Sequence, residues 1–162
     1  MLPVTPLDVA WQDTVPQILY GLLLIGLVLT CVGYVFISVT LRFRAYLQNG
    51  GFHSKLSANA SFICCTLILA LTQLFAITLW AVSLLLIGKA HSWDQAFRYS
   101  ASSYTTLGIF VQDMPSGWHL IPTFIAFSGL FSFAWATSST MSMVNALTSY
   151  LEAPENQTHQ AR

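Results

Sequence analysis

The stretch of sequence that decides the fold is Ser100-Ala-Ser-Ser-Tyr-Thr-Thr-Leu-Gly-Ile-Phe110, a hydroxyl-rich segment with one glycine. It lies between two long apolar segments. Irregular backbone at membrane depth is tolerated only where protein buries it or where it lines a water-filled cavity. If the flanking segments cross a bilayer, this stretch therefore either lines a pore or plugs one, and both alternatives remain open at this point.

The composition is that of a membrane protein. Only 7% of the 162 residues are charged and 55% are hydrophobic, whereas soluble domains carry about 25% charged residues. Three uncharged runs, 14–41, 56–88 and 114–151, each exceed the ~20 residues that a helix needs to cross a ~30 Å hydrocarbon core. We therefore expect an all-α membrane protein with three transmembrane helices.

The distribution of basic residues predicts the orientation. The loop between the first two apolar runs holds Arg42, Arg44 and Lys55 and no acid, so the positive-inside rule makes it cytoplasmic. The N-terminus is then outside and the C-terminus cytoplasmic. The expected order is an extracytoplasmic arm (1–14), a first transmembrane helix (15–41), a cytoplasmic loop (42–59), a pore module (60–150) and a cytoplasmic tail (151–162).

A short helix is predicted directly before the deciding stretch. Ser92 can cap its N-terminus, Asp94 lies in its first turn, and Gln95 follows three residues after the cap, which is a capping-box pattern. The helix would end near Tyr104 and is too short to span a bilayer. Together with the segment that follows, it must enter and leave by the same face. We therefore expect a re-entrant pore helix and loop between the second and third transmembrane helices.

Small residues form one face of the third transmembrane helix. They recur at steps of three or four residues, at Ser128, Ser132, Ala136, Ser139 and Ser142. Such a face either allows close packing of helices or forms the wall of a water-filled cavity. Gly129 is either a bend or a packing contact, and Gln73 makes either a helix-to-helix hydrogen bond or a ligand contact.

The order of these elements resembles the pore module of tetrameric potassium channels. It resembles more closely the small bacterial pore-loop ion channels that carry an extra helix before the pore unit, and the resemblance covers roughly 60–145. The matching residues are Ser102, Thr105, Thr106, Leu107 and Gly108, followed by Pro115, Gly117 and Trp118. The resemblance implies a homotetramer in a bacterial inner membrane, in which backbone carbonyls of a selectivity filter coordinate monovalent cations.

The filter-like segment departs from the family pattern at two positions. Ile109 and Phe110 stand where the family has an aromatic residue and then a glycine. Because a bulky residue resists the backbone conformations that glycine accepts, Phe110 should disrupt the upper carbonyl rings, while Thr106 and Leu107 can retain the lower ones. Three outcomes remain open: weakly selective conduction, gating by dewetting at an apolar ring, or no conduction within a partner complex.

These observations predict a cation channel subunit whose altered filter is weakly selective. The alternative is a non-conducting structural or accessory subunit of a larger membrane complex. The expected ion pathway consists of Thr105, Thr106, Leu107, Gly108, Ile109 and Phe110, with Asp113 at the outer mouth, the small-residue face as inner lining, and Gly129 as a candidate hinge. Asp113 either concentrates cations in a ring of carboxylates or is a solvated loop acid.

The expected partners are membrane lipid, further copies of the chain and monovalent cations. Nucleic acid is not expected, because no basic stripe is present. An enzyme is not expected either, because the apolar runs hold no acid and none of the four histidines has a partner at helical ligand spacing. No metal or cofactor is predicted.

Overall fold

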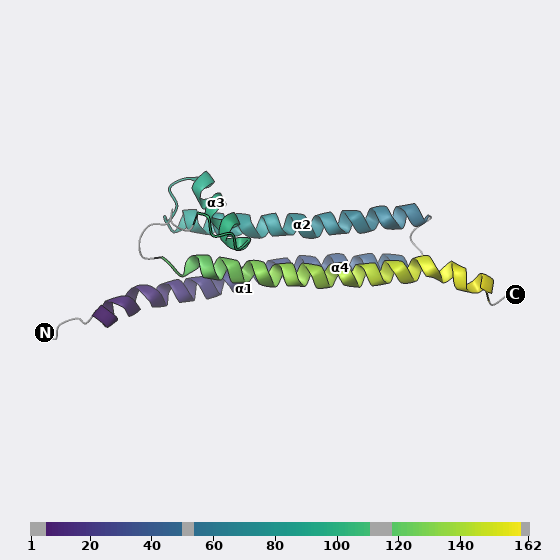
Figure 1. The fold of residues 1–162 in the computed structure, drawn as a ribbon, viewed down its shortest axis with the longest axis horizontal. Helices are drawn as coiled ribbons and strands as arrows, with labels where there is room; N and C mark the ends of the chain where they lie inside the picture. The colour runs from purple at the N-terminus through teal and green to yellow at the C-terminus, as the bar shows by residue number, and fades with distance from the viewer. Residues whose placement is uncertain (1–5, 50–53, 111–117, 160–162) are drawn as a thin grey trace. The chain divides into compact units, whose positions relative to one another are not determined.

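The computed structural model describes residues 6–49, 54–110 and 118–159, which form four helices (Figure 1). These are α1 (Pro6–Gln48), α2 (Lys55–Leu86), α3 (Trp93–Tyr104) and α4 (Ile121–His159). No strand occurs in the described residues, which confirms the all-α prediction. Three segments are long and apolar enough to cross a membrane: Thr14–Gln48, Lys55–Leu86 and Ile121–Glu152.

The long helices extend beyond the boundaries predicted from the uncharged runs. α1 begins at Pro6, inside the predicted arm 1–14, and α4 continues as helix into the predicted tail 151–162. The predicted loop 42–59 is shortened from both sides, by the end of α1 and the start of α2 at Lys55. The reason is that loss of charge marks the part of a helix that can lie in hydrocarbon. It does not mark the helix ends, where charged residues are also good helix formers.

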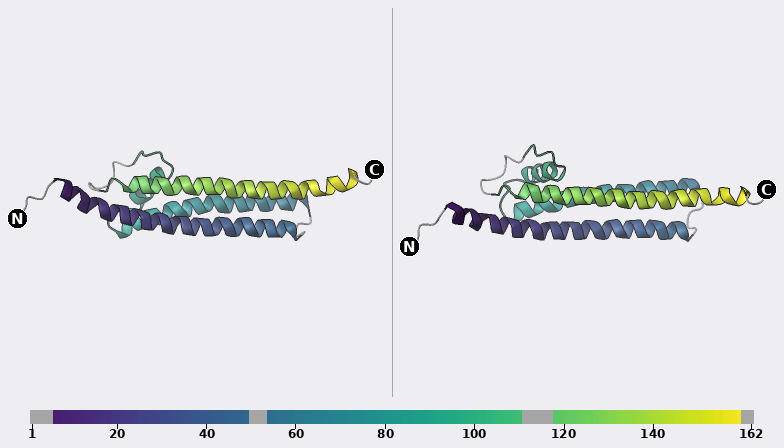
Figure 2. Two further views of the ribbon diagram at one scale, coloured as in Figure 1. Left: turned by 90° about the horizontal axis from the view of Figure 1, so that it is seen from below. Right: turned by 60° about the horizontal axis from the view of Figure 1, so that its bottom comes forward.

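The chain divides into two compact units, each containing parts of several helices. The first consists of Met1–Cys31 and Gln73–Ser132, and the second of Val32–Thr72 and Phe133–Arg162. In the first unit, α3 lies beside the C-terminal part of α2 and the N-terminal part of α4 (Figures 1 and 2). The largest fully buried side chains of this unit are Trp80, Tyr104, Leu84, Ile121 and Ile125.

The second unit has its own buried side chains. Phe36 and Met143 are fully buried, and the rings of Phe43 and Phe62 have centroids 6.2 Å apart. The indole of Trp135 lies against Gly33, where a Cβ atom would meet the ring. A glycine at this position therefore allows α4 to pack closely on α1 within this unit.

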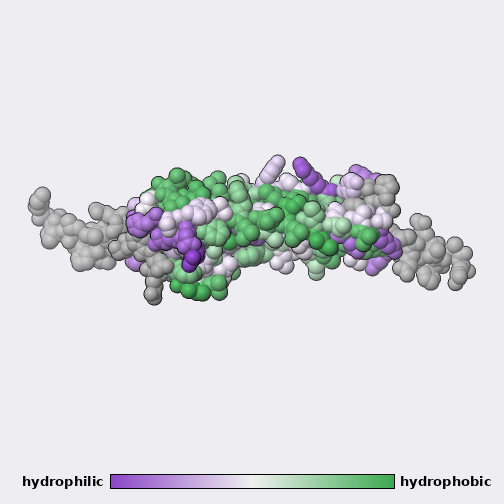
Figure 3. Space-filling view, turned by 90° about the horizontal axis from the view of Figure 1, so that it is seen from above, coloured by the Kyte–Doolittle hydropathy of each residue, from purple (hydrophilic) through white to green (hydrophobic). Residues whose placement is uncertain are grey.

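Apolar residues cover much of the face of the molecule that is drawn in Figure 3. Among the most exposed are Leu19, Leu23, Leu71 and Phe131, each more than 60% accessible. Extended apolar surface of this kind is unfavourable in water and generally marks a surface that contacts a membrane or another protein. Together with the length of the helices, it fits a membrane protein.

Candidate functional site

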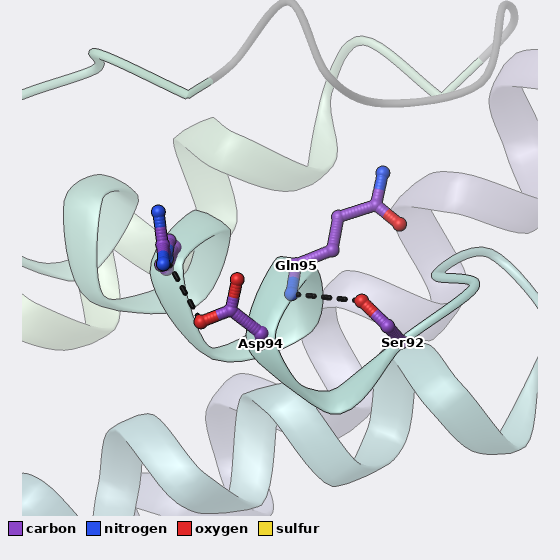
Figure 4. A network of polar contacts seen from close by, with 4 residues as sticks. Ser92, Asp94 and Gln95 are labelled. Carbon is purple, nitrogen blue, oxygen red and sulfur yellow. Dashed lines mark hydrogen bonds and ion pairs between the residues drawn. The ribbon is translucent and has the colours of Figure 1, made fainter.

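α3 starts at the predicted cap. The hydroxyl of Ser92 accepts a hydrogen bond from the Gln95 amide at 3.2 Å (Figure 4), and the Gln95 side chain accepts one from the His91 amide at 3.0 Å. The capping box is therefore present, with its return bond shifted to the residue before the cap. Asp94 and Arg98 form an exposed ion pair at 2.9 Å, so neither contributes an unpaired charge to this helix.

The C-terminal end of α3 is attached to α2 and α4 through Tyr104. This side chain is fully buried, and its hydroxyl donates a 2.6 Å hydrogen bond to Oε1 of Gln73. The Gln73 amide nitrogen in turn donates to the carbonyl of Ser132 at 3.3 Å. Gln73 therefore makes helix-to-helix hydrogen bonds, the first of the two roles predicted for it.

Gly129 lies directly against the backbone of α3. A Cβ atom at this position would overlap the carbonyl oxygen of Tyr104 and approach its carbonyl carbon to 3.0 Å. The glycine therefore makes the packing contact that was one of its two predicted roles. Its role as a hinge stays a prediction.

Two serines of the predicted pore-lining face are packed inside the chain. Ser128 and Ser132 have no exposed surface, and Ser128 accepts a 2.9 Å hydrogen bond from the Trp80 indole while donating to the Ile125 carbonyl at 2.7 Å. Within the chain, Ser128 and Ser132 therefore take part in helix packing, whereas Ser139 is 9% exposed and Ala136 and Ser142 are partly exposed. The pore-lining role of this face stays a prediction.

Buried hydroxyls also occur on α3 itself. Tyr99, Ser100 and Ser103 are at most 3% exposed, and their hydroxyl oxygens have no hydrogen-bond partner among the described residues. Burial raises the pKa of Tyr99 above its ordinary value. This phenol is therefore neutral over the whole physiological range of pH.

The backbone amides that follow α3 all point back to the end of this helix. Six successive N–H groups, from Thr105 to Phe110, donate to atoms of Ala101, Ser102 or Ser103. The amide of residue 105 donates to the Ala101 carbonyl and that of residue 106 to the Ser103 carbonyl, both at 3.0 Å. The amides of residues 107 and 108 donate to the Ser102 carbonyl, at 2.9 and 3.2 Å. The amides of residues 109 and 110 donate to the Ser102 side-chain oxygen Oγ, at 2.9 and 3.5 Å. One residue, Ser102, thus accepts four of the six.

The orientation of the amides fixes the orientation of the carbonyls. All peptide bonds in the described residues are trans, so each carbonyl points opposite to the N–H of the next residue. The carbonyls of residues 105–109 are therefore directed away from α3. No described residue donates a backbone hydrogen bond to them, and the five residues are exposed.

Left-handed backbone conformations alternate along this loop. Thr106 has a φ of 61° and Gly108 a φ of 67°, and Thr106 is the one non-glycine residue with positive φ in the described part of the chain. A positive φ is costly for a residue with a Cβ atom. Phe110 does not continue the alternation, and the predicted effect of Phe110 on the upper carbonyls stays a prediction.

The structure brings the six residues of the predicted ion pathway together in this one loop. Asp113, predicted for the outer mouth, lies outside the described residues, as do Pro115 and Gly117. Two residues important to the site, Ser102 and Tyr104, were not among the predicted site residues. The signal for Ser102 was its position two residues before the predicted helix end, where a serine oxygen can accept amide hydrogen bonds that the helix leaves unpaired.

No protein-family model matches the chain, and no match was found among curated proteins or among solved structures. The fold and the site together define an all-helical chain with three helices of membrane-spanning length and composition. Its distinguishing feature is a short helix followed by a loop whose amides are bonded back to that helix.

Proposed function

We propose that the chain is a subunit of a tetrameric pore-loop cation channel, in which the loop 105–109 lines the ion pathway. The observation that supports this proposal is the run of five successive carbonyls directed away from α3, in exposed residues. A monovalent cation that enters a narrow pathway loses part of its hydration shell, and rings of backbone carbonyls can replace it.

Several copies of the chain are needed for such a pathway, because one loop cannot enclose a pore. Four copies around a central axis form a closed cyclic assembly. α3 and its loop would then re-enter the membrane from the outer face, with the N-terminus outside. The basic residues Arg42 and Arg44 near the end of α1, and Lys55 at the start of α2, would lie on the cytoplasmic side. The partially negative C-terminus of α3 would favour a cation in the cavity.

The proposed filter is weakly selective. The alternation of backbone conformations that turns carbonyls to one side includes Thr106 and Gly108 but not Phe110. Fewer carbonyl rings give fewer ion sites, and we expect monovalent cations to pass with little preference for potassium over sodium.

A non-conducting accessory subunit is the second candidate. The side chains of Leu107 and Ile109 are each 67% exposed at the loop, and apolar side chains at such positions favour coverage by other protein. In the channel a neighbouring copy of the chain would cover these two side chains, and in the accessory subunit an unrelated protein would cover them. The assembly state of the purified protein distinguishes these two cases.

Potassium-driven and sodium-driven flux into liposomes, measured for the purified protein, tests the channel proposal. The matched variant is Gly108→Pro, because proline fixes φ near −65° and lacks an amide hydrogen, whereas Gly108 has a φ of 67° and donates to Ser102. We expect flux for the parent protein and none for the variant. Absence of flux for a correctly assembled parent would contradict conduction and favour the accessory subunit.

Substitution of Phe110 by glycine is expected to increase selectivity for potassium. Glycine accepts positive φ at little cost, so Phe110→Gly can extend the alternation by one step and add a ring of inward carbonyls. The measurement is the ratio of potassium to sodium flux in the same liposomes. The control is Phe110→Ala, which removes the aromatic ring but keeps a Cβ atom. An unchanged flux ratio for Phe110→Gly would mean that the register assumed for the filter is wrong.

A further inference from the structure

A groove runs between α1 and α4 within the second unit. It consists of three adjoining cavities of about 330, 300 and 210 Å³. The first two share Arg44, Ala146 and Ser149 in their linings, and Ser142 joins the second to the third. We call this continuous feature the α1–α4 groove.

Around Arg44, which lines the first two cavities, the α1–α4 groove is positively charged. Arg44 lines it together with Ser142, Asn145 and Ser149. The Arg44 guanidinium has no ion pair or hydrogen bond in the described part of the chain, where the one ion pair joins Asp94 to Arg98. An unpaired guanidinium beside hydroxyl and amide groups matches the oxygens of a phosphate group in charge and in hydrogen-bonding capacity.

The other end of the groove is mostly apolar. Its lining includes Ile37, Leu41 and the partly exposed indole of Trp135. From Trp135 to Ser149 the helix rises by about 21 Å, at 1.5 Å per residue. One leaflet contributes about half of the ~30 Å hydrocarbon core, so the groove is long enough for a head group and the acyl chain attached to it.

We infer that the α1–α4 groove binds an anionic phospholipid, with its phosphate at Arg44 and one acyl chain along Ile37, Leu41 and Trp135. A soluble anion would use only the charged end and leave the apolar end uncovered. A zwitterionic lipid would offer the same phosphate together with a positive group that Arg44 repels. This inference goes beyond the channel proposal, because it requires only that the long helices lie in a membrane.

One acidic residue limits the expected affinity. Glu152 follows Ser149 by three residues on α4 and therefore lies on the same face of this helix. No ion pair between Glu152 and Arg44 is present. The carboxylate would repel an anionic head group, so Glu152→Gln is expected to strengthen lipid binding, opposite in sign to the loss of Arg44.

Native mass spectrometry of the full chain, titrated in detergent with phosphatidylglycerol or phosphatidylcholine, tests this inference. A basic residue near a membrane surface contributes about 1 kcal/mol to anionic lipid binding. The preference for phosphatidylglycerol is therefore expected to fall about fivefold in Arg44→Gln. Arg42→Gln is the matched control, because Arg42 carries the same charge two residues away on α1 and does not line the groove.

The acyl chain is tested separately from the head group. Phosphatidylglycerol with brominated acyl chains is expected to quench the fluorescence of the parent protein more than that of Trp135→Phe. The inference is overturned if both arginine variants lose the preference equally, if inorganic phosphate displaces the lipid, or if Trp135→Phe is quenched as strongly as the parent. A change of oligomeric state in Arg44→Gln without loss of lipid would instead assign the groove to a second copy.

Discussion

Replacing Ser102 with alanine is expected to release the end of the loop after α3 and to reduce ion flux about tenfold. The change removes the Oγ atom that accepts the amides of Ile109 and Phe110 at 2.9 and 3.5 Å, but it leaves the Ser102 carbonyl in place. Leaving a buried amide without its hydrogen-bond acceptor costs about 1–3 kcal/mol. Because residue 109 is exposed, we expect about 1–2 kcal/mol, or roughly a 5–30-fold smaller population of the ordered loop.

Amide hydrogen exchange measures this effect without reference to conduction. In Ser102→Ala, exchange should accelerate at Ile109 and Phe110, while Leu107 and Gly108 keep their protection because their acceptor is the unchanged Ser102 carbonyl. Ser103→Ala is the matched control, since the Ser103 hydroxyl is buried without a partner in the described residues. Equal exchange in the two variants would show that the Ser102 side chain does not hold the loop.

Replacing Gly129 with alanine is expected to separate α3 from α4 and to destabilise the protein by at least about 1–3 kcal/mol, the usual cost of overpacking. The added Cβ atom would overlap the carbonyl oxygen of Tyr104. Both the new atom and the oxygen belong to the backbone framework, so no side-chain rotation relieves the overlap. The shift should also strain the hydrogen bond from Tyr104 to Gln73.

The control for Gly129→Ala is the same substitution at Gly26. No atom lies within 4 Å of a Cβ added at Gly26, so Gly26→Ala should stabilise α1 by about 0.5–1 kcal/mol. Thermal unfolding in detergent, followed by circular dichroism, compares the two variants. Similar midpoints for Gly26→Ala and Gly129→Ala would mean that the close approach of α3 to α4 is not maintained in solution.

Composition and capping residues were sufficient to predict the helices. The uncharged runs identified the three long helices, because burial of a charge in hydrocarbon is costly. Ser92 and Gln95 identified the start of α3, because their side chains bond nearby amides. Helix ends in polar sequence were not predictable, since charged residues are compatible with helix and with loop alike.

The site was predictable as a segment but not as a set of contacts. The hydroxyl-rich stretch with one glycine located the loop, and Gly108 indeed has positive φ. The face containing Ser128 and Ser132 could not be assigned, because small residues serve helix packing and cavity walls equally well. The packing role of Ser128 depends on Trp80, because a buried indole needs a hydrogen-bond acceptor. The Trp80 indole donates to the Ser128 hydroxyl.

The hydrogen bonding of residues 105–110 also determines which solutes the loop can hold. Every amide of this segment is already bonded to the end of α3, so its backbone offers acceptors and no donors. Chloride, phosphate and carboxylates find no backbone donor there and meet the partial negative charge of carbonyl oxygens. Compact cations that carry N–H groups, such as ammonium and guanidinium, are by contrast complementary to this surface and are suitable first candidates for inhibitors of the proposed channel.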